Sequence, residues 1–344
     1  MSIYYRPIIQ MDNSKPKLFY NVGKKKQWFD RVEIMQRGEI PKIVPAQSIP
    51  VKILKRIQNA RDLHDFGSIK RTMIMGILNV TPDSFSDGGK NFALVNAIKA
   101  AEMMISEGAD ILDIGGESTR PGAKVISEHE ELTRIIPVLK HIKRNYPSFP
   151  VSVDTRKSGV MARVIELGID FINDVSAMSF DSKSKQILAA KDTKICLMHG
   201  GLDPEKMQDN ISYTDVLLDV YDYLRDSIDA AIATGILPEN IIIDPGIGFG
   251  KTTEQNLLLI RKASLFHSLG YPILYGVSRK RFIGVIGQVS RAVDRFPGSI
   301  ATTIELVRQG IQVIRVHDVR ETKQALNLWE SIINTDEITD GRYG

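Results

Sequence analysis

The sequence has few of the features that would place it outside the ordinary globular enzymes. It holds a single cysteine, Cys196, so no internal disulfide can form. This thiol lies in an apolar run, which predicts a buried small hydrophobe in a reducing compartment. No apolar run approaches the roughly 20 residues that a membrane-spanning helix needs, and the first residues show no apolar segment of a secretory signal. We therefore expect a cytoplasmic protein without a membrane partner.

Several catalytic patterns are also missing. The six histidines show no zinc-ligand spacing with the cysteine or the aspartates, which argues against a metallohydrolase. No Ser-His-Asp or Cys-His signature of nucleophilic catalysis is visible. Gly250-Lys251-Thr252 resembles the end of a phosphate-binding loop, but Pro245 stands where that loop requires its leading glycine. We interpret this segment as a tight turn that orients Asp244 and exposes Phe249.

The charge is nearly balanced, at +4 overall, in a chain that is 43% hydrophobic and 25% charged, which is typical of globular enzymes. Residues 1–71 nevertheless hold 15 Lys and Arg against 6 Asp and Glu. Such a surplus can attract nucleic acid, but a solvated surface segment is the favoured interpretation. The aromatic-basic interleaving of a nucleic-acid platform is missing, so we expect no nucleic-acid partner.

From residue 72 onward, short β-rich runs alternate with longer amphipathic stretches, which predicts a parallel α/β sheet. The expected strands are 72–79, 110–115, 150–154, 170–174, 193–198, 240–244, 272–277 and 311–316. The expected helices are 91–107, 127–145, 156–168, 183–191, 212–234, 254–268, 297–309 and 320–333, and a further helical pattern covers 51–66. Eight strand–helix pairs in about 270 residues have the size of a (β/α)8 TIM barrel.

A doubly wound open sheet is the structural alternative. Nearly every expected strand ends in polar or glycine residues, from Asn79 on the first to His317 after the last. An open sheet concentrates its chemistry at one switch point, whereas a barrel gathers all its strand ends on one rim. We therefore predict a TIM barrel over 72–336 and a tail over 337–344. Residues 1–71 form an N-terminal extension that we expect on the barrel's N-terminal face or flank.

Carboxylate or amide groups end three of the expected strands, at Asp154, Asn173 and Asp244. A lone carboxylate in this place commonly caps a helix, and Asp154 could do only that. Three such groups converging on one rim instead suit a flat ring that presents several N–H donors. We interpret the neighbouring Asp174 as structural.

Cationic and anion-seeking groups end the other strands. Ser118, Thr119 and Arg120 follow two consecutive glycines, which let a backbone approach a ligand closely, although an ordinary turn is the alternative. Arg315 and His317 are two residues apart on a strand and therefore share a face. A guanidinium and an imidazole that point together at a rim suit a diphosphate.

The first strand and its loop run from Met73 to Gly89 and end in Asn-Val-Thr-Pro-Asp-Ser-Phe-Ser-Asp-Gly-Gly. This segment resembles the first signature of dihydropteroate synthases, and Asp113 to Ala123 resembles the second. The resemblance continues through Asp-Pro-Gly, Ser-Arg-Lys and Arg-Val-His to about Ile333. It implies a transferase of folate biosynthesis, a sulfonamide target, that joins 4-aminobenzoate to (7,8-dihydropterin-6-yl)methyl diphosphate and releases diphosphate.

The resemblance also implies roles for individual residues. Pterin recognition falls to Asp154, Asn173 and Asp244, and catalysis to Asp87, Arg120 and Lys280. Mg²⁺ would be held at Asn79, and the protein would be a homodimer. The other expected substrate-binding residues are Thr119, Met198, Phe249, Arg315, His317, Phe85 and Pro121, with Lys280 again among them. Met198 is equally compatible with a core methionine.

Two other functions fit parts of this pattern. A pterin-dependent methyltransferase shares the carboxylates, but that family lacks the full first loop and the Ser-Arg-Lys motif, and no corrinoid-binding domain is visible. A paralogue that binds pterin without turnover has no need of the catalytic loops or of Lys280. Arg281 is a point of variation, since some dihydropteroate synthases have serine after this lysine.

Overall fold

The computed structural model describes residues 2–23, 26–59, 71–81, 89–118, 125–200 and 212–334. Its central sheet has eight parallel strands in the order β11-β10-β9-β8-β7-β6-β13-β12. A parallel bridge between Ile243 and Ile273 joins the two ends of this order. The strands are β6 (Met73–Asn79), β7 (Ile111–Gly115), β8 (Val151–Asp154), β9 (Phe171–Asp174), β10 (Lys194–Met198), β11 (Ile241–Asp244), β12 (Leu274–Tyr275) and β13 (Val313–Val316). The predicted TIM barrel is confirmed.

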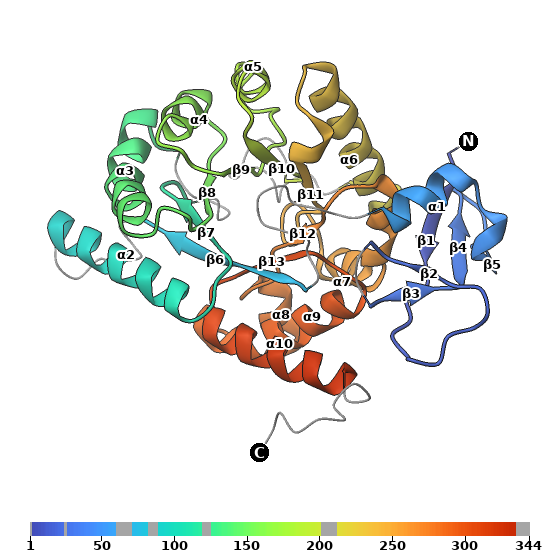
Figure 1. Cartoon of the computed structure of the whole chain (residues 1–344). Coiled ribbons are helices and arrows are strands. Elements are labelled where there is room, and N and C mark those ends of the chain that lie inside the picture. The colour runs from blue at the N-terminus through green and yellow to red at the C-terminus, as the bar shows by residue number, and fades with distance from the viewer. Residues whose placement is uncertain are drawn as a thin grey trace.

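Helices surround this sheet on the outside (Figure 1). They are α2 (Gly89–Ser106), α3 (Glu128–Asn145), α4 (Ser158–Ile165), α5 (Ser184–Ala189), α6 (Val216–Ala233), α7 (Thr253–Arg261), α8 (Arg281–Ile286), α9 (Phe296–Arg308) and α10 (Val319–Ile333), with 3-10 turns η3 (Pro238–Asn240), η4 (Ala263–Leu269) and η5 (Ala292–Arg295). Among the helices that the structure describes, none is both long and apolar enough to cross a bilayer.

The inner face of the barrel is apolar toward the N-terminal ends of the strands and polar toward their C-terminal ends. One buried cluster fills the lower part, made of Met73, Met75, Ile111, Phe171, Cys196, Ile242, Leu274 and Val313. Side chains two residues apart on a strand point to the same side. Asp113, Asn173 and Arg315 therefore point into the barrel interior, each two residues after a buried apolar residue: Ile111, Phe171 and Val313. The sheet geometry alone gathers these polar groups at one end.

The N-terminal extension forms a small module of its own. Its strands β1 (Tyr4–Pro7), β4 (Arg31–Met35) and β5 (Lys42–Pro45) make an antiparallel sheet in the order β1-β4-β5, and β2 (Tyr20–Asn21) pairs with β3 (Trp28–Phe29). A 3-10 turn η1 (Ala46–Ser48) and helix α1 (Val51–Gln58) follow. A separate buried cluster of Val22, Phe29, Val32, Ala46, Ile49 and Ile57 holds the module together.

This module contacts the barrel through hydrogen bonds and charges. The Ser264 hydroxyl on η4 donates to the Pro7 carbonyl at 2.9 Å, and the Gln27 amide donates to the Val307 carbonyl at 3.0 Å. The Tyr4 hydroxyl donates to Asp222 on α6 at 2.7 Å. Because η4 and the end of α9 lead into β12 and β13, two of these contacts lie at the N-terminal ends of the barrel strands; in Figure 1 the module lies beside α6.

Two helices end well before their predicted ends. The helical pattern over 51–66 gives α1, which ends at Gln58 because Asn59 leaves the helical region, with φ −59° and ψ 140°; residues 60–66 lie outside the described residues. The pattern indicated a single helix over 254–268, but α7 ends at Arg261, and η4 begins after Lys262, which has φ −107° and ψ 21°. All seven residues of η4 are buried, so the pattern of buried positions does not mark the point where the α-helix ends. The short α8 and η5, which carry Arg281 and Arg295, were not predicted at all.

Candidate functional site

A narrow pocket lies at the C-terminal ends of the barrel strands and brings seven of the predicted substrate-binding residues together. Its lining consists of Asp154, Asn173, Val175, Met198, Asp244, Ile247, Phe249, Gly276, Lys280 and Arg315. A second, open cavity of about 1070 Å³ shares Phe249, Gly276, Lys280 and Arg315 with it and also contains Asn79, Ser278, Arg281 and His317. The narrow pocket, of about 20 Å³, is therefore contiguous with the open cavity.

The pocket contains two carboxylates that burial makes weaker acids. Burial raises the pKa of Asp154 to about 7; Arg315 opposes this shift, and the charge of Asp113 adds to it. Burial likewise raises the pKa of Asp244 to about 6, against a hydrogen bond from the Gly246 amide at 2.7 Å. Both groups are less than 10% exposed. N–H donors of a ligand would supply these carboxylates with hydrogen bonds that water cannot reach them to make.

Arg315 is held between two carboxylates. Its Nε donates to Asp113 at 2.5 Å and its Nη2 donates to Asp154 at 2.8 Å. These carboxylates raise the pKa of Arg315, although its burial acts in the opposite direction. Asp113 was not among the predicted site residues. Its position two residues after the buried Ile111 was the available signal, because a carboxylate at an interior strand position needs a partner.

Asn173 presents an acceptor to the pocket. Its Nδ2 donates to Asp113 at 3.0 Å. Its Oδ1 is buried and has no hydrogen-bond partner among the described residues. An unpaired buried acceptor is costly, so this atom marks a place where a ligand donor would be stabilising.

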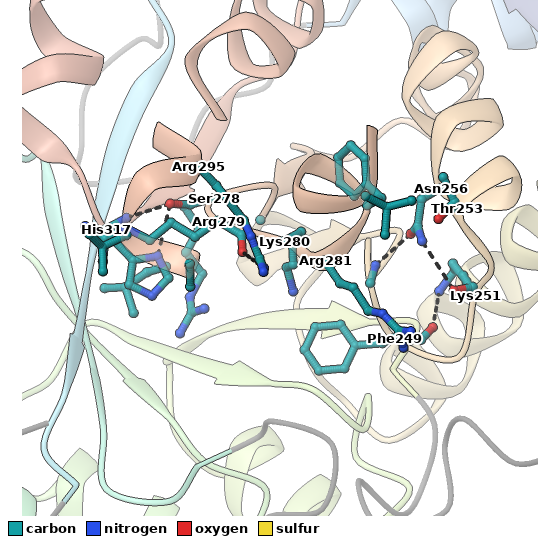
Figure 2. Close-up of a pocket in the computed structure, with 18 of the residues that line it drawn as sticks. Phe249, Lys251, Thr253, Asn256, Ser278, Arg279, Lys280, Arg281, Arg295 and His317 are labelled. Carbon is teal, nitrogen blue, oxygen red and sulfur yellow. Dashed lines mark hydrogen bonds between the residues drawn. The ribbon is translucent and has the colours of Figure 1, made fainter. Parts of the chain in front are cut away.

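Lys280 links the two cavities. Its ammonium lies 4.2 Å from the centre of the Phe249 ring, a cation–π contact. Burial lowers the pKa of Lys280 to about 8, as does the charge of Arg315, while Asp244 and Asp154 oppose the shift. Figure 2 shows Lys280 between the Ser278–His317 pair and Phe249. The lysine is therefore placed to contact groups in both cavities.

The turn after β11 is held together by a buried lysine, Lys251. The Lys251 ammonium donates to the Gly246 and Phe249 carbonyls at 2.8 and 2.9 Å, and it also contacts Nδ1 and the carbonyl of His199. Burial lowers the pKa of Lys251 to about 7, and burial followed by the Lys251 charge lowers the pKa of His199 to about 3. Thr252 caps α7 in a capping box. These contacts hold the tight turn that the sequence predicted, which carries Phe249.

Asp174, next to Asn173, points into its own turn. It accepts from the Ser176 amide and hydroxyl at 2.8 and 2.6 Å and from the Met178 amide at 2.8 Å. Its role is structural, as expected.

The open cavity has a polar end at Asn79 and His317. His317 Nδ1 lies 3.0 Å from the Ser278 hydroxyl, which also accepts from the His317 amide at 3.1 Å. Among the described residues, no group of three or more His, Cys, Asp or Glu is arranged to hold a metal. One amide oxygen at Asn79 still fits Mg²⁺, which keeps several waters and uses one or two protein oxygens with substrate phosphates.

The remaining predicted site residues lie outside the described residues. They are Phe85, Asp87, Thr119, Arg120 and Pro121. The neighbouring Thr81 and Ser118 line the open cavity. Arg281 also lines it, at the start of α8, and in Figure 2 it extends on the side of Phe249.

Fold and site together define a TIM-barrel enzyme with a buried pocket for a donor-rich ring beside a cationic site for an anion. Residues 75–317 match the family model of the pterin binding enzymes. The dihydropteroate synthase of Clostridium beijerinckii is 43% identical over 270 residues, which cover 78% of this chain and 97% of that protein.

Two solved structures are similar in fold as well as in sequence. The Clostridium difficile dihydropteroate synthase, crystallised with pteroic acid, has a TM-score of 0.72 and 42% identity over 76% of this chain and 97% of that one. The Xanthomonas albilineans enzyme with 4-aminobenzoic acid has a TM-score of 0.72 and 39% identity, covering 77% and 94%. The chain belongs to the dihydropteroate synthase family.

Proposed function

We propose that this protein condenses (7,8-dihydropterin-6-yl)methyl diphosphate with 4-aminobenzoate to give 7,8-dihydropteroate and diphosphate in folate biosynthesis. The observation that carries the proposal is the narrow pocket, in which Asp154, Asn173 and Asp244 face Lys280 and Arg315. Membership of the family supports it.

The pterin lies in the narrow pocket. Ionised Asp154 and Asp244 accept from its ring N–H and amino groups, and the unpaired Asn173 Oδ1 accepts a further donor. Met198 supplies an apolar wall for the ring face, and Lys280 donates to a ring acceptor while Phe249 packs beside it. The Asn173 Oδ1 atom, which has no partner among the described residues, then accepts a hydrogen bond from the ligand.

The diphosphate lies in the open cavity. Arg315 and His317 neutralise charge that builds on the leaving oxygens. Mg²⁺ bound with Asn79 would add further stabilisation of that charge. As the pterin takes over Asp154, the Nη2 group of Arg315 becomes available to the anion. The resemblance to the family assigns Asp87 to the cationic pterin fragment and Arg120, Thr119, Phe85 and Pro121 to the aminobenzoate side; these five lie outside the described residues.

No general base is needed at the nucleophile. The aniline nitrogen of 4-aminobenzoate is neutral near pH 7 and attacks a methylene carbon that has already lost most of its bond to the diphosphate oxygen. The C–O electron pair leaves with the diphosphate, and the proton that the nitrogen loses after the C–N bond forms passes to that diphosphate or to water. The protein contributes position and charge, which for such dissociative reactions supplies most of the rate.

We extend the proposal to the whole molecule. The barrel over 72–336 carries the site, and the described residues of the extension 1–71 line neither cavity. The protein is a cytoplasmic homodimer that uses Mg²⁺ and small-molecule substrates. Sedimentation of the purified chain checks the dimer, and a chelator followed by Mg²⁺ add-back checks the metal.

Diphosphate release tests the activity. The purified protein is given pterin diphosphate and 4-aminobenzoate, and dihydropteroate is measured alongside diphosphate. We expect equal amounts of both products, and none with Lys280→Ala. Pterin binding without release of diphosphate contradicts the proposal and identifies a non-catalytic binder.

A further inference from the structure

We propose that Asp113 is the positioning residue of the pocket. It turns the oxygen end of the Asn173 amide toward the ligand, and it holds Arg315 beside Asp154. The inference rests on the proposed function only for the identity of the ligand. Asp113 is not part of the pocket lining, so it acts through its neighbours and does not touch the ligand.

The carboxylate of Asp113 is surrounded by side chains from three other strands. Oδ1 accepts from the Ser152 hydroxyl on β8 at 2.6 Å. Oδ2 accepts from Asn173 Nδ2 on β9 at 3.0 Å and from Arg315 Nε on β13 at 2.5 Å. Asp113 itself is on β7 and is 0% exposed. One buried charge therefore orients polar groups across half of the barrel.

The contrast with Asp174 shows that this arrangement is not a general feature of buried carboxylates here. Asp174 is also 0% exposed, and it is the last residue of its strand, β9. Its partners are the backbone and hydroxyl groups of the next four residues. Asp174 stabilises a local turn, whereas the partners of Asp113 include two pocket-lining residues.

The contact with Asn173 determines the orientation of its amide. An ionised carboxylate is acceptor-only, so it can face the NH₂ end of the amide but not the oxygen end. With Nδ2 directed at Asp113, the oxygen must point toward the pocket, where it has no partner among the described residues. The pocket thus offers a third acceptor, next to Asp154 and Asp244, to a ligand rich in N–H donors.

The contact with Arg315 has a second consequence. Nε is bound to Asp113 while Nη2 is bound to Asp154, so the guanidinium is fixed at two points. When ligand donors compete for Asp154, only the Nη2 contact has to break, and Nε keeps the side chain in the barrel. Arg315 can then redirect one arm without leaving the site.

Asp113→Asn tests the inference, with Asp174→Asn as a matched control. The neutral amide offers at most one uncharged oxygen to Asn173 Nδ2 and Arg315 Nε, which both donate to the charged Oδ2 in the wild type. We expect its affinity for 6-hydroxymethyl-7,8-dihydropterin, measured by calorimetry, to fall about tenfold or more. In the control, thermal stability falls but pterin affinity stays within about twofold.

A double-mutant cycle with Asn173→Ala separates positioning from general destabilisation. If Asp113 acts in part by orienting the Asn173 amide, Asp113→Asn has a smaller effect on pterin affinity in the Asn173→Ala background than in the wild type. Strict additivity of the two losses, or unchanged affinity in Asp113→Asn, overturns the inference. If the wild-type protein binds no pterin, the proposed function fails instead.

A measurement on the wild-type protein covers the case in which Asp113→Asn does not fold. The side-chain amide protons of Asn173, assigned in NMR spectra by their loss in Asn173→Ala, should resist exchange with solvent both before and after pterin is added. Rapid exchange in the ligand-free protein, or loss of protection on binding, shows that the amide is not held by Asp113.

Discussion

At the scale of single residues, water exclusion decides which pocket groups carry charge near neutral pH. Asp154 is ionised only above a pKa of about 7, and Lys280 is protonated only below a pKa of about 8. The reaction needs an acceptor carboxylate and a cation at the same time. The two ionisation states coexist best in a narrow interval between these values.

We therefore expect a bell-shaped pH dependence of kcat/KM for the pterin diphosphate. Activity rises as Asp154 loses its proton near pH 7 and falls as Lys280 loses its proton near pH 8. Initial rates across the neutral range, from mildly acidic to mildly alkaline buffers at constant ionic strength, provide the measurement. In Lys280→Arg, whose side chain stays charged, any remaining activity should lack the alkaline limb. The same alkaline limb in that variant contradicts the assignment.

Asp244→Asn should weaken pterin binding by about 2–5 kcal/mol, because a charged acceptor becomes a mixed donor and acceptor among buried N–H groups. Titration calorimetry with the bare pterin measures the loss. Glu239→Asn, in an exposed position just before β11, is the control. Wild-type affinity in Asp244→Asn removes this residue from the site.

Sequence patterns locate most pocket residues but not their partners. Asp154 and Asp244 could be recognised because each ends a strand, and Asn173 and Arg315 because each is next to last on its strand. Lys280 follows β12 by five residues and could be recognised through its Ser-Arg-Lys motif. Asp113 lies two residues before the end of its strand, and nothing in the local pattern says that residues from β9 and β13 converge on it. Contacts between strands far apart in sequence are set by barrel closure, which a linear pattern does not contain.

At the scale of elements, the turn between β11 and α7 contains a glycine at a position where a side chain would clash. Gly246 has φ +69°, and a Cβ there would lie 2.0 Å from the His199 carbonyl oxygen. The turn carries Phe249, and its Gly246 backbone amide donates to the Asp244 carboxylate. The sequence predicted a tight turn here, but only the packing of His199 explains why position 246 has no room.

Gly246→Ala should lower the free energy of unfolding by clearly more than Gly168→Ala. Gly168 has a similar φ of +76°, but no atom lies within 4 Å of the place that a Cβ would take, so its substitution reports backbone strain alone, about 1–2 kcal/mol. Urea denaturation of both variants gives the comparison. Equal losses would show that the turn moves away from His199 without penalty.

At the scale of the whole molecule, a buried ion cluster joins the extension to the barrel. Glu33 on β4 accepts from Arg6 at 2.5 Å and from Lys262, next to η4, at 2.7 and 2.8 Å. Burial raises the pKa of Glu33, but the hydrogen bonds from Lys262 and Arg6 outweigh it and lower the pKa overall. Composition alone indicated a solvated basic segment and gave no sign of this contact.

Glu33→Gln should reduce the free energy of unfolding by about 1.5–3 kcal/mol near pH 7, since it removes charged hydrogen bonds. A carboxyl with a lowered pKa stabilises the fold above its unfolded pKa and loses that contribution as the pH falls through its folded value. The difference from the wild type should therefore shrink in acid. Glu39→Gln, exposed on the same module, is the control. A difference that stays constant from neutral pH into acid contradicts the ion-cluster account.

The barrel closes at its weakest point. β12 has two residues, a single bridge joins Ile243 to Ile273, and the Ile273 amide donates to the Gln312 side chain at 2.9 Å where a neighbouring strand would offer a carbonyl. Asp244 lies on one side of this closure, and Lys280 and Arg315 lie on the other.

Transient local opening should therefore begin between β11 and β12, and it would separate the acceptor half of the pocket from its cationic half. A bound pterin diphosphate contacts both halves and therefore stabilises the closed barrel relative to the open one. Deuterium uptake at the amides of Ile243 and Ile273 should be among the fastest in the sheet and should slow when ligand binds. Because β1 and α1 pack on η4, directly before β12, the extension restrains this opening from the opposite end of the barrel.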